Sequence, residues 1–107
     1  MVLNISFKHM KTSDHIKDYT EKKSEKLKKY FKGKIHVTWS FSVEKDTMIA
    51  HCHLLGNHMD YFGEAMTEDM EISIDRAVEK IEKQVRKHKE IVKDHLHKNA
   101  RRTPDVD

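Results

Sequence analysis

The sequence predicts an α+β fold, in which one domain holds a four-stranded sheet with two helices packed on one face. Four stretches alternate between apolar and polar residues, which is the pattern of a strand with one buried face. Two longer stretches repeat apolar residues at helical spacing. The resulting order is β-α-β-β-β-α, and a chain of 107 residues suits a single domain with one core.

The first strand and the first helix follow from two local patterns. Residues 2–9 (VLNISFKH) alternate, as expected of a half-buried strand. Ser13 precedes a helical repeat and is predicted to cap its N-terminus. The repeat continues to residue 31, and Gly33 is expected to end the helix.

Three more strands and a long helix are predicted in the rest of the chain. Strict alternation marks residues 34–43 (KIHVTWSFSV), and weaker patterns mark residues 47–55 and 58–66. A helix is then expected to start at Thr67 and to run to about residue 97. We therefore expect a folded domain over residues 1–97, followed by a flexible basic and polar tail over residues 98–107.

Basic charge is concentrated in the two predicted helical regions, although the net charge of the chain is only +3. Residues 1–33 hold nine lysines against four acidic residues, and residues 76–102 hold ten lysines and arginines against four. Residues 34–67 are net acidic, with two lysines against four carboxylates. This asymmetry favours a localised basic surface.

On a helical wheel, the charges of the last helix separate by face. Arg76, Lys80, Lys83 and Lys87 form one basic stripe, and carboxylates line another flank. If both helices lie on the same face of the sheet, their basic flanks are expected to form a groove for a phosphate backbone. A solvated helix surface remains the alternative. The predicted RNA-binding residues are Lys22, Lys23, Lys26, Lys29, Arg76, Lys80, Lys83, Arg86, Lys87, Lys89 and Lys93.

Four fragments in order along the chain resemble a known family. They are LNI (3–5), LKKYF (27–31), DM…ID (69–75), and Gln84 followed by KHK (87–89). Together they resemble the short ribosome hibernation promoting factors and ribosome-associated inhibitor A. The chain departs from the family at Ser24, where an apolar residue is common, which is expected to loosen the packing of the first helix.

The resemblance implies a fold similar to a double-stranded-RNA-binding domain with an additional first strand. It also implies a factor that binds the small ribosomal subunit and its rRNA, in the channel used by mRNA and tRNA near the decoding centre. Such a factor would compete with tRNA and mRNA and inhibit translation in stationary phase or stress, and we expect it to be a monomer off the ribosome. The implied contacts are Lys22, Lys23, Lys26, Lys29, Lys80, Lys83, Arg86, Lys87 and Lys89.

Two other functions are compatible with the sequence. One is a generic double-stranded-RNA-binding domain. The other is a metal-responsive protein–protein interaction module, in which His36, His51, His53 and His58 form a cluster on the sheet face away from the helices. We expect these histidines to be exposed and without a metal.

No catalytic motif or phosphate-binding glycine loop is present in the sequence, so we expect neither an enzyme nor a cofactor. Cys52, the single cysteine, is predicted to be a buried strand residue. The N-terminal residues lack a continuous apolar stretch, and no segment is apolar enough to span a membrane. These features favour a cytoplasmic protein without a membrane partner.

Overall fold

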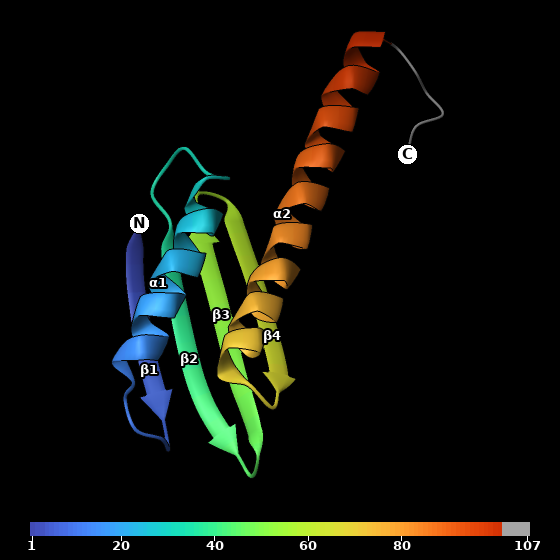
Figure 1. The fold of residues 1–107 in the computed structure, drawn as a ribbon. Helices are drawn as coiled ribbons and strands as arrows, with labels where there is room; N and C mark the ends of the chain where they lie inside the picture. Colours follow the sequence, from blue (N-terminus) through green and yellow to red (C-terminus); the bar gives the residue numbers. More distant parts are fainter. Residues whose placement is uncertain (102–107) are drawn as a thin grey trace.

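The structure, a computed structural model, describes the backbone of residues 1–101 and the side chains of residues 1–87. Its element order confirms the predicted α+β fold (Figure 1). The elements are β1 (Val2–Lys8), α1 (Asp14–Lys28), β2 (His36–Glu44), β3 (Thr47–Gly56), β4 (Met59–Thr67) and α2 (Met70–Arg101).

The four strands form one sheet in the order β1-β2-β3-β4. β1 pairs with β2 in parallel, because α1 carries the chain back across the sheet between them. The other two pairs are antiparallel hairpins. Ser6, Ser40, His51 and Glu64 therefore form one row across the sheet.

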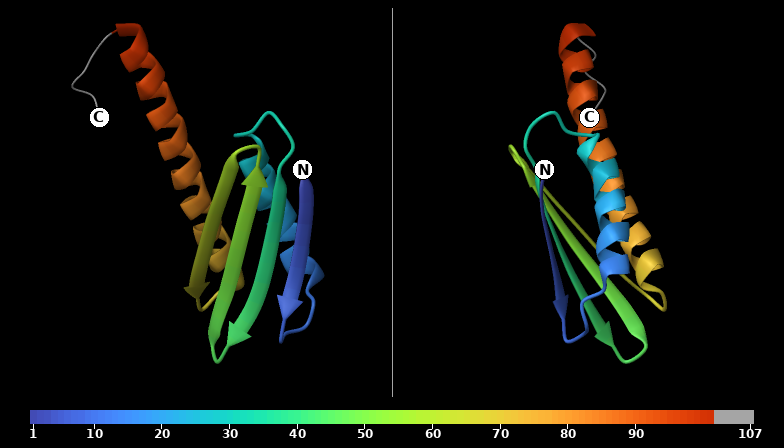
Figure 2. Two further views of the ribbon diagram at one scale, coloured as in Figure 1. Left: turned by 180° about the vertical axis from the view of Figure 1, so that it is seen from behind. Right: turned by 60° about the vertical axis from the view of Figure 1, so that its left-hand side comes forward.

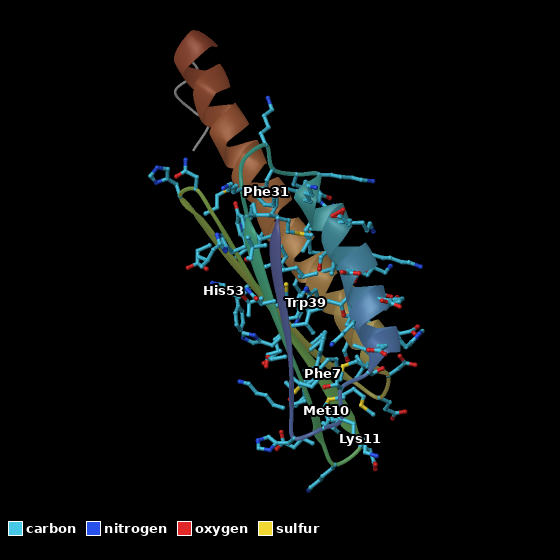
Figure 3. The ribbon with its side chains drawn as sticks, turned by 90° about the vertical axis from the view of Figure 1, so that its left-hand side faces the viewer. Phe7, Met10, Lys11, Phe31, Trp39 and His53 are labelled. Atoms are coloured by element: carbon cyan, nitrogen blue, oxygen red, sulfur yellow. The ribbon has the colours of Figure 1, made fainter. Side chains whose placement is uncertain are left out.

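Both helices cover the same face of the sheet, and the opposite face carries no element among the described residues (Figure 2). Trp39, Phe41 and Leu54 are fully buried on the covered face, where they meet Ile74 and Ile81 of α2. Figure 3 shows Trp39 between the sheet and the helices, whereas His53 points away from them. The domain thus has one core on one side and an open sheet surface on the other.

The start of α1 is as predicted, whereas its end comes earlier. The Ser13 side chain accepts a hydrogen bond from the backbone of Ile16 at 3.2 Å, which confirms the cap. The helix ends at Lys28 rather than near residue 31, because Tyr30 and Phe31 bond three residues back in a tighter turn. That turn places the centroid of the Phe31 ring 6.3 Å from the centroid of the Tyr61 ring.

Ser24 has a specific role in the core. The indole Nε1 of Trp39 donates a hydrogen bond of 2.9 Å to Ser24 Oγ, and both residues are fully buried. An apolar residue at this position would leave the indole N–H without a partner, at a cost of about 1–3 kcal/mol. The expectation that Ser24 loosens the packing of α1 is therefore not supported.

α2 begins at Met70, three residues after the predicted start, because Asp69 caps it. The carboxylate of Asp69 accepts hydrogen bonds from the backbone of Glu71 at 2.8 Å and of Ile72 at 3.3 Å. The helix then lies very close to β4 at Gly63. A Cβ atom at this position would be only 2.5 Å from the carbonyl oxygen of Ala77. This close approach holds α2 against the edge strand of the sheet.

α2 continues past the end of the sheet (Figure 1). Its 32 residues span about 48 Å. The predicted boundary between domain and tail at residue 97 stays a prediction, since α2 continues to Arg101 and residues 102–107 lie outside the described part. None of the helices in the described part combines the length and apolar character needed to cross a bilayer.

Candidate nucleic-acid interface

The acidic flank of α2 faces α1. Asp75 accepts a hydrogen bond of 2.7 Å from the hydroxyl of Tyr19 and forms an ion pair of 3.2 Å with Lys23. The ammonium group of Lys23 also lies 5.3 Å from the centre of the Tyr19 ring. One carboxylate therefore joins two side chains of α1 to α2.

Two more carboxylates make the same kind of contact along the helix pair. Glu71 pairs with His15 near the start of both helices. Glu82 accepts a hydrogen bond of 3.2 Å from the hydroxyl of Tyr30 beyond the end of α1. The acidic flank of α2 thus connects the two helices along the length of α1.

The half-buried Tyr19 shows how this contact affects a neighbouring group. Burial, followed by the hydrogen bond to Asp75 and the charge of that carboxylate, raises the pKa of Tyr19 to about 12. The hydroxyl therefore keeps its proton, and remains a donor, through the whole physiological range.

The groove between the helices differs from the one expected from the sequence. Two ammonium groups and three carboxylates line it, together with Val78, in a volume of about 130 Å³. Since carboxylates outnumber ammonium groups, the groove does not suit a phosphate backbone. The prediction of a single groove lined by basic side chains is therefore wrong. The charged residues that line it are Lys23, Lys26, Asp75, Glu79 and Glu82.

The basic stripe of α2 lies on the other flank of the helix, toward β4 and solvent. Arg76, Lys83 and Lys87 are exposed. Lys80 follows the same stripe, but its ammonium group donates a hydrogen bond of 2.5 Å to the backbone carbonyl of Glu64. The stripe therefore presents three unengaged cations, and one cation bound to the sheet edge.

α1 carries a second basic stripe, formed by Lys22, Lys26 and Lys29, and all three residues are exposed. The acidic groove lies between this stripe and that of α2. Arg86, also exposed, follows Glu82 on the flank of α2 that faces α1. The basic surface consequently has two parts, which we name the α1 ridge (Lys22, Lys26, Lys29) and the α2 ridge (Arg76, Lys83, Lys87).

The structure thus divides the predicted RNA-binding residues into three groups. Lys23 and Lys80 are engaged within the protein. The side chains of Lys89 and Lys93 lie outside the described part. The other seven have no ion pair or hydrogen bond within residues 1–87; they are Lys22, Lys26, Lys29, Arg76, Lys83, Arg86 and Lys87.

Gln84 has a role that the sequence did not predict. Its Nε2 donates to the carbonyl of Phe62 at 2.6 Å, and its Oε1 accepts from the Phe62 amide at 3.3 Å. The amide side chain therefore occupies the outward backbone groups of β4 as a neighbouring strand would. In the sequence, Gln84 stood out only as part of a fragment that resembles the family, and this did not indicate a contact with the strand edge.

The open face of the sheet does not gather the four histidines. His58 lies in the turn before β4 with a φ of 61°, and β2, which carries His36, does not neighbour β4. His51 packs edge-on against the ring of Phe62, and His53 hydrogen-bonds to Asp60 at 2.6 Å. Among the described residues, no group of three or more histidine, cysteine or acidic side chains is placed to hold a metal ion.

Cys52 is fully buried on the covered face of the sheet, as predicted. Burial raises the pKa of its thiol well above the usual value. Its neighbours His51 and His53 point to the opposite face, so no described base lies beside the sulfur. The thiol is therefore a core group without the features of a nucleophile.

Comparison with known proteins connects this arrangement to a family. Residues 3–93 match the profile of the family described as "Sigma 54 modulation protein / S30EA ribosomal protein". The ribosome hibernation promoting factor of Klebsiella oxytoca is 32% identical over 95 residues, which are 89% of this chain and all of that protein. The factor of the same name from Azotobacter vinelandii is 31% identical over 90 residues, or 84% of each chain.

Solved structures give the same picture for the fold. The crystal structure of the Thermus thermophilus protein Y N-terminal domain superposes with a TM-score of 0.77 at 26% identity. The match covers 82% of this chain and 99% of that domain. A ribosomal subunit interface protein from Coxiella burnetii superposes with a TM-score of 0.73 at 20% identity, over 83% of this chain and 98% of its own. The β-α-β-β-β-α fold is thus shared with both.

Proposed function

The chain belongs to the Sigma 54 modulation protein / S30EA ribosomal protein family, and from this premise we propose that it is a ribosome hibernation factor. It binds the small ribosomal subunit in the channel of mRNA and tRNA near the decoding centre. By filling this channel it inhibits translation in stationary phase or stress. The names of the relatives, ribosome hibernation promoting factor and ribosomal subunit interface protein, support the ribosome as the partner.

The observation that supports rRNA as the contacted component is the pair of basic ridges on the helix face. Six exposed cations project from the two ridges, and Arg86 adds a seventh. Ammonium and guanidinium groups that are not engaged within the protein are available to neutralise phosphates and release counterions. The carboxylates on the other flank of α2 hold the helices together. These cations therefore form the surface that is available to an anionic partner.

The acidic groove affects how RNA is held. Asp75, Glu79 and Glu82 repel a phosphate between the ridges. Each ridge therefore contacts its own stretch of phosphate backbone, and the protein bridges two segments of folded rRNA. Folded rRNA offers such paired segments, whereas an isolated single strand offers one.

The mechanism is steric, since the protein supplies bulk and charge and performs no chemical step. The folded domain occupies space that the mRNA and the anticodon arms of tRNA need. With about six to nine phosphate contacts, its affinity should fall by about three decades or more between 50 and 200 mM salt.

Co-sedimentation with purified ribosomal subunits tests this function. The protein should pellet with the small subunit, and excess tRNA should release it in proportion to tRNA occupancy. A free RNA duplex serves as the competitor that identifies a generic duplex-binding domain. Equal binding to the duplex and to the small subunit, or pelleting that tRNA leaves unchanged, would contradict binding in the channel.

A further inference from the structure

Side chains from the rest of the chain cover the backbone groups at one edge of the sheet but not at the other. At the β4 edge, Gln84 occupies both outward backbone groups of Phe62, and Lys80 occupies the carbonyl of Glu64. These contacts prevent another strand from pairing along the centre of β4. The corresponding groups of β1 have no such cover within the described residues.

The register identifies which backbone groups of β1 are open. Val2 donates its amide to the carbonyl of Ile35 at 2.9 Å, and β1 pairs with β2 in parallel from Val2 to Lys8. In a parallel pair, alternate residues direct both backbone groups to the same neighbour. Val2, Asn4, Ser6 and Lys8 therefore face β2, and the amides and carbonyls of the three residues between them face outward. These residues are Leu3, Ile5 and Phe7.

The side chains of Leu3, Ile5 and Phe7 lie on the covered face of the sheet but are only half-buried. Beside them, a groove of about 400 Å³ lies between β1 and α1. Met1 and Leu3 provide its apolar wall, and Glu21, Lys22 and Glu25 of α1 complete it. The edge therefore combines unpaired backbone groups and incompletely covered apolar side chains, and its α1 wall presents two carboxylates beside the ammonium group of Lys22.

We propose that the β1 edge binds an extended, basic segment of a partner protein as a fifth strand. The backbone of the segment pairs with Leu3, Ile5 and Phe7, which gives affinity without sequence readout. Its apolar side chains cover Ile5 and Phe7. A lysine or arginine lays its stem on Met1 and Leu3 and directs its charge to Glu21 and Glu25. Lys22 belongs to both this groove and the α1 ridge, whereas Glu21, Glu25 and the open backbone groups of β1 belong to this edge alone.

The shape of the edge favours a peptide over a second copy of the chain. Because α1 helps to line the groove at β1, it extends to the edge of the sheet. Pairing of β1 with β1 of a second copy across a twofold axis would bring the second α1 into the same space, on the same face. An extended segment carries no helix and enters beside α1 without this conflict.

An NMR titration of the isotope-labelled protein tests the proposal. The probe is a capped heptapeptide, TVTVTRT, which places two valines and one arginine on one face when extended. Its comparator, TVTVTET, differs only in charge. We expect TVTVTRT to shift the amide signals of Leu3, Ile5 and Phe7 and to slow their hydrogen exchange, and we expect TVTVTET to bind about tenfold more weakly.

Three variants make the outcome specific. The exposed pair Glu21→Lys and Glu25→Lys should reverse the preference between the peptides, whereas Glu44→Lys and Glu68→Lys, an equal change of charge elsewhere, should leave it unchanged. Ile5→Pro removes an outward N–H but leaves the hydrogen bonds to β2, and should abolish binding.

Three results would overturn the proposal. They are unchanged β1 signals at saturating probe, peptide shifts confined to the open sheet face, and concentration-dependent self-association that broadens the β1 signals. The last result would assign the edge to a second copy. The variant with Glu21→Lys and Glu25→Lys should still bind the ribosome. Failure of the peptide test can therefore be distinguished from failure of the proposed function.

Discussion

One flank of α2 turns Glu71, Asp75 and Glu82 toward α1, and the other turns Arg76, Lys83 and Lys87 toward solvent. The carboxylates have partners in α1 or in the turn that follows it, and the three cations have none among residues 1–87. Both flanks are strongly charged in the sequence, but the acidic flank joins the two helices, whereas on the basic stripe only Lys80, among residues 1–87, is bound to another group of the protein. A surface for an anionic partner is therefore recognised by charges that have no intramolecular role.

The largest effect that this difference predicts is loss of ribosome binding when the α2 ridge is reversed. Lys83→Glu together with Lys87→Glu removes two phosphate contacts and adds two repulsive charges. We expect the affinity for the small subunit to fall at least about a hundredfold, measured by co-sedimentation. Thermal unfolding should be nearly unchanged, because both side chains are exposed.

The control for this reversal is Lys8→Glu with Lys11→Glu, which makes the same change of charge away from both ridges. The control protein should keep most of its affinity. Equal loss in both proteins would show that net charge, and not the α2 ridge, determines binding.

The opposite substitution, on the acidic flank, should change stability and leave binding intact. Asp75→Ala leaves the half-buried hydroxyl of Tyr19 without its acceptor and Lys23 without its ion pair. We expect the free energy of unfolding, measured in urea, to fall by about 1–2 kcal/mol. Affinity for the small subunit should not decrease, since the freed Lys23 adds a cation to the face. A loss of binding as large as that of the ridge reversal would contradict the separate roles of the two flanks.

The pKa of Tyr19 gives a pH test of the same contact. Because the folded-state pKa is raised to about 12 from 10, the unfolded state loses its proton first as the pH rises. The contribution is fully present below pH 10 and is lost between pH 10 and 12, by about 1 kcal/mol after allowance for solvent screening. Tyr19→Phe should show a shallower loss of stability over this interval. Identical alkaline profiles for the two proteins would contradict this role of Tyr19.

The smallest effect concerns Gln84, a polar residue beside the basic flank with a structural contact. Gln84→Ala should reduce the free energy of unfolding by about 1 kcal/mol or less, since two hydrogen bonds at a solvent-exposed edge are lost. It should also promote self-association through β4, detectable by analytical ultracentrifugation. Arg86→Ala, two positions further along, should remain monomeric.

Local patterns predicted most of the fold. The strict alternation around Trp39 identified β2 to within two residues, because side chains of a strand point alternately to the two faces of the sheet. Ser13 was the correct cap of α1, since capping depends on residues close in sequence. Boundaries that depend on distant packing were less accurate, as at the end of α1, where Phe31 turns to meet Tyr61.

The candidate interface was predictable only in part. The wheel separated the acidic and basic flanks of α2, because a helix fixes the angles between its own side chains. It did not show which flank faces α1, since that depends on how two helices pack on a sheet. Ser24 and Gln84 were missed for the same reason: their partners, Trp39 and Phe62, lie far from them in the sequence.

The burial of Cys52 has a practical consequence for experiments on this protein. Its single native thiol is inaccessible and held in the protonated form, so it will react slowly with maleimide reagents in the folded state. One cysteine introduced at an exposed position, such as Lys45 in the turn between β2 and β3, can therefore take a fluorophore selectively without removal of Cys52. The natural sequence is thus already suited to single-site labelling for measurements of docking and release.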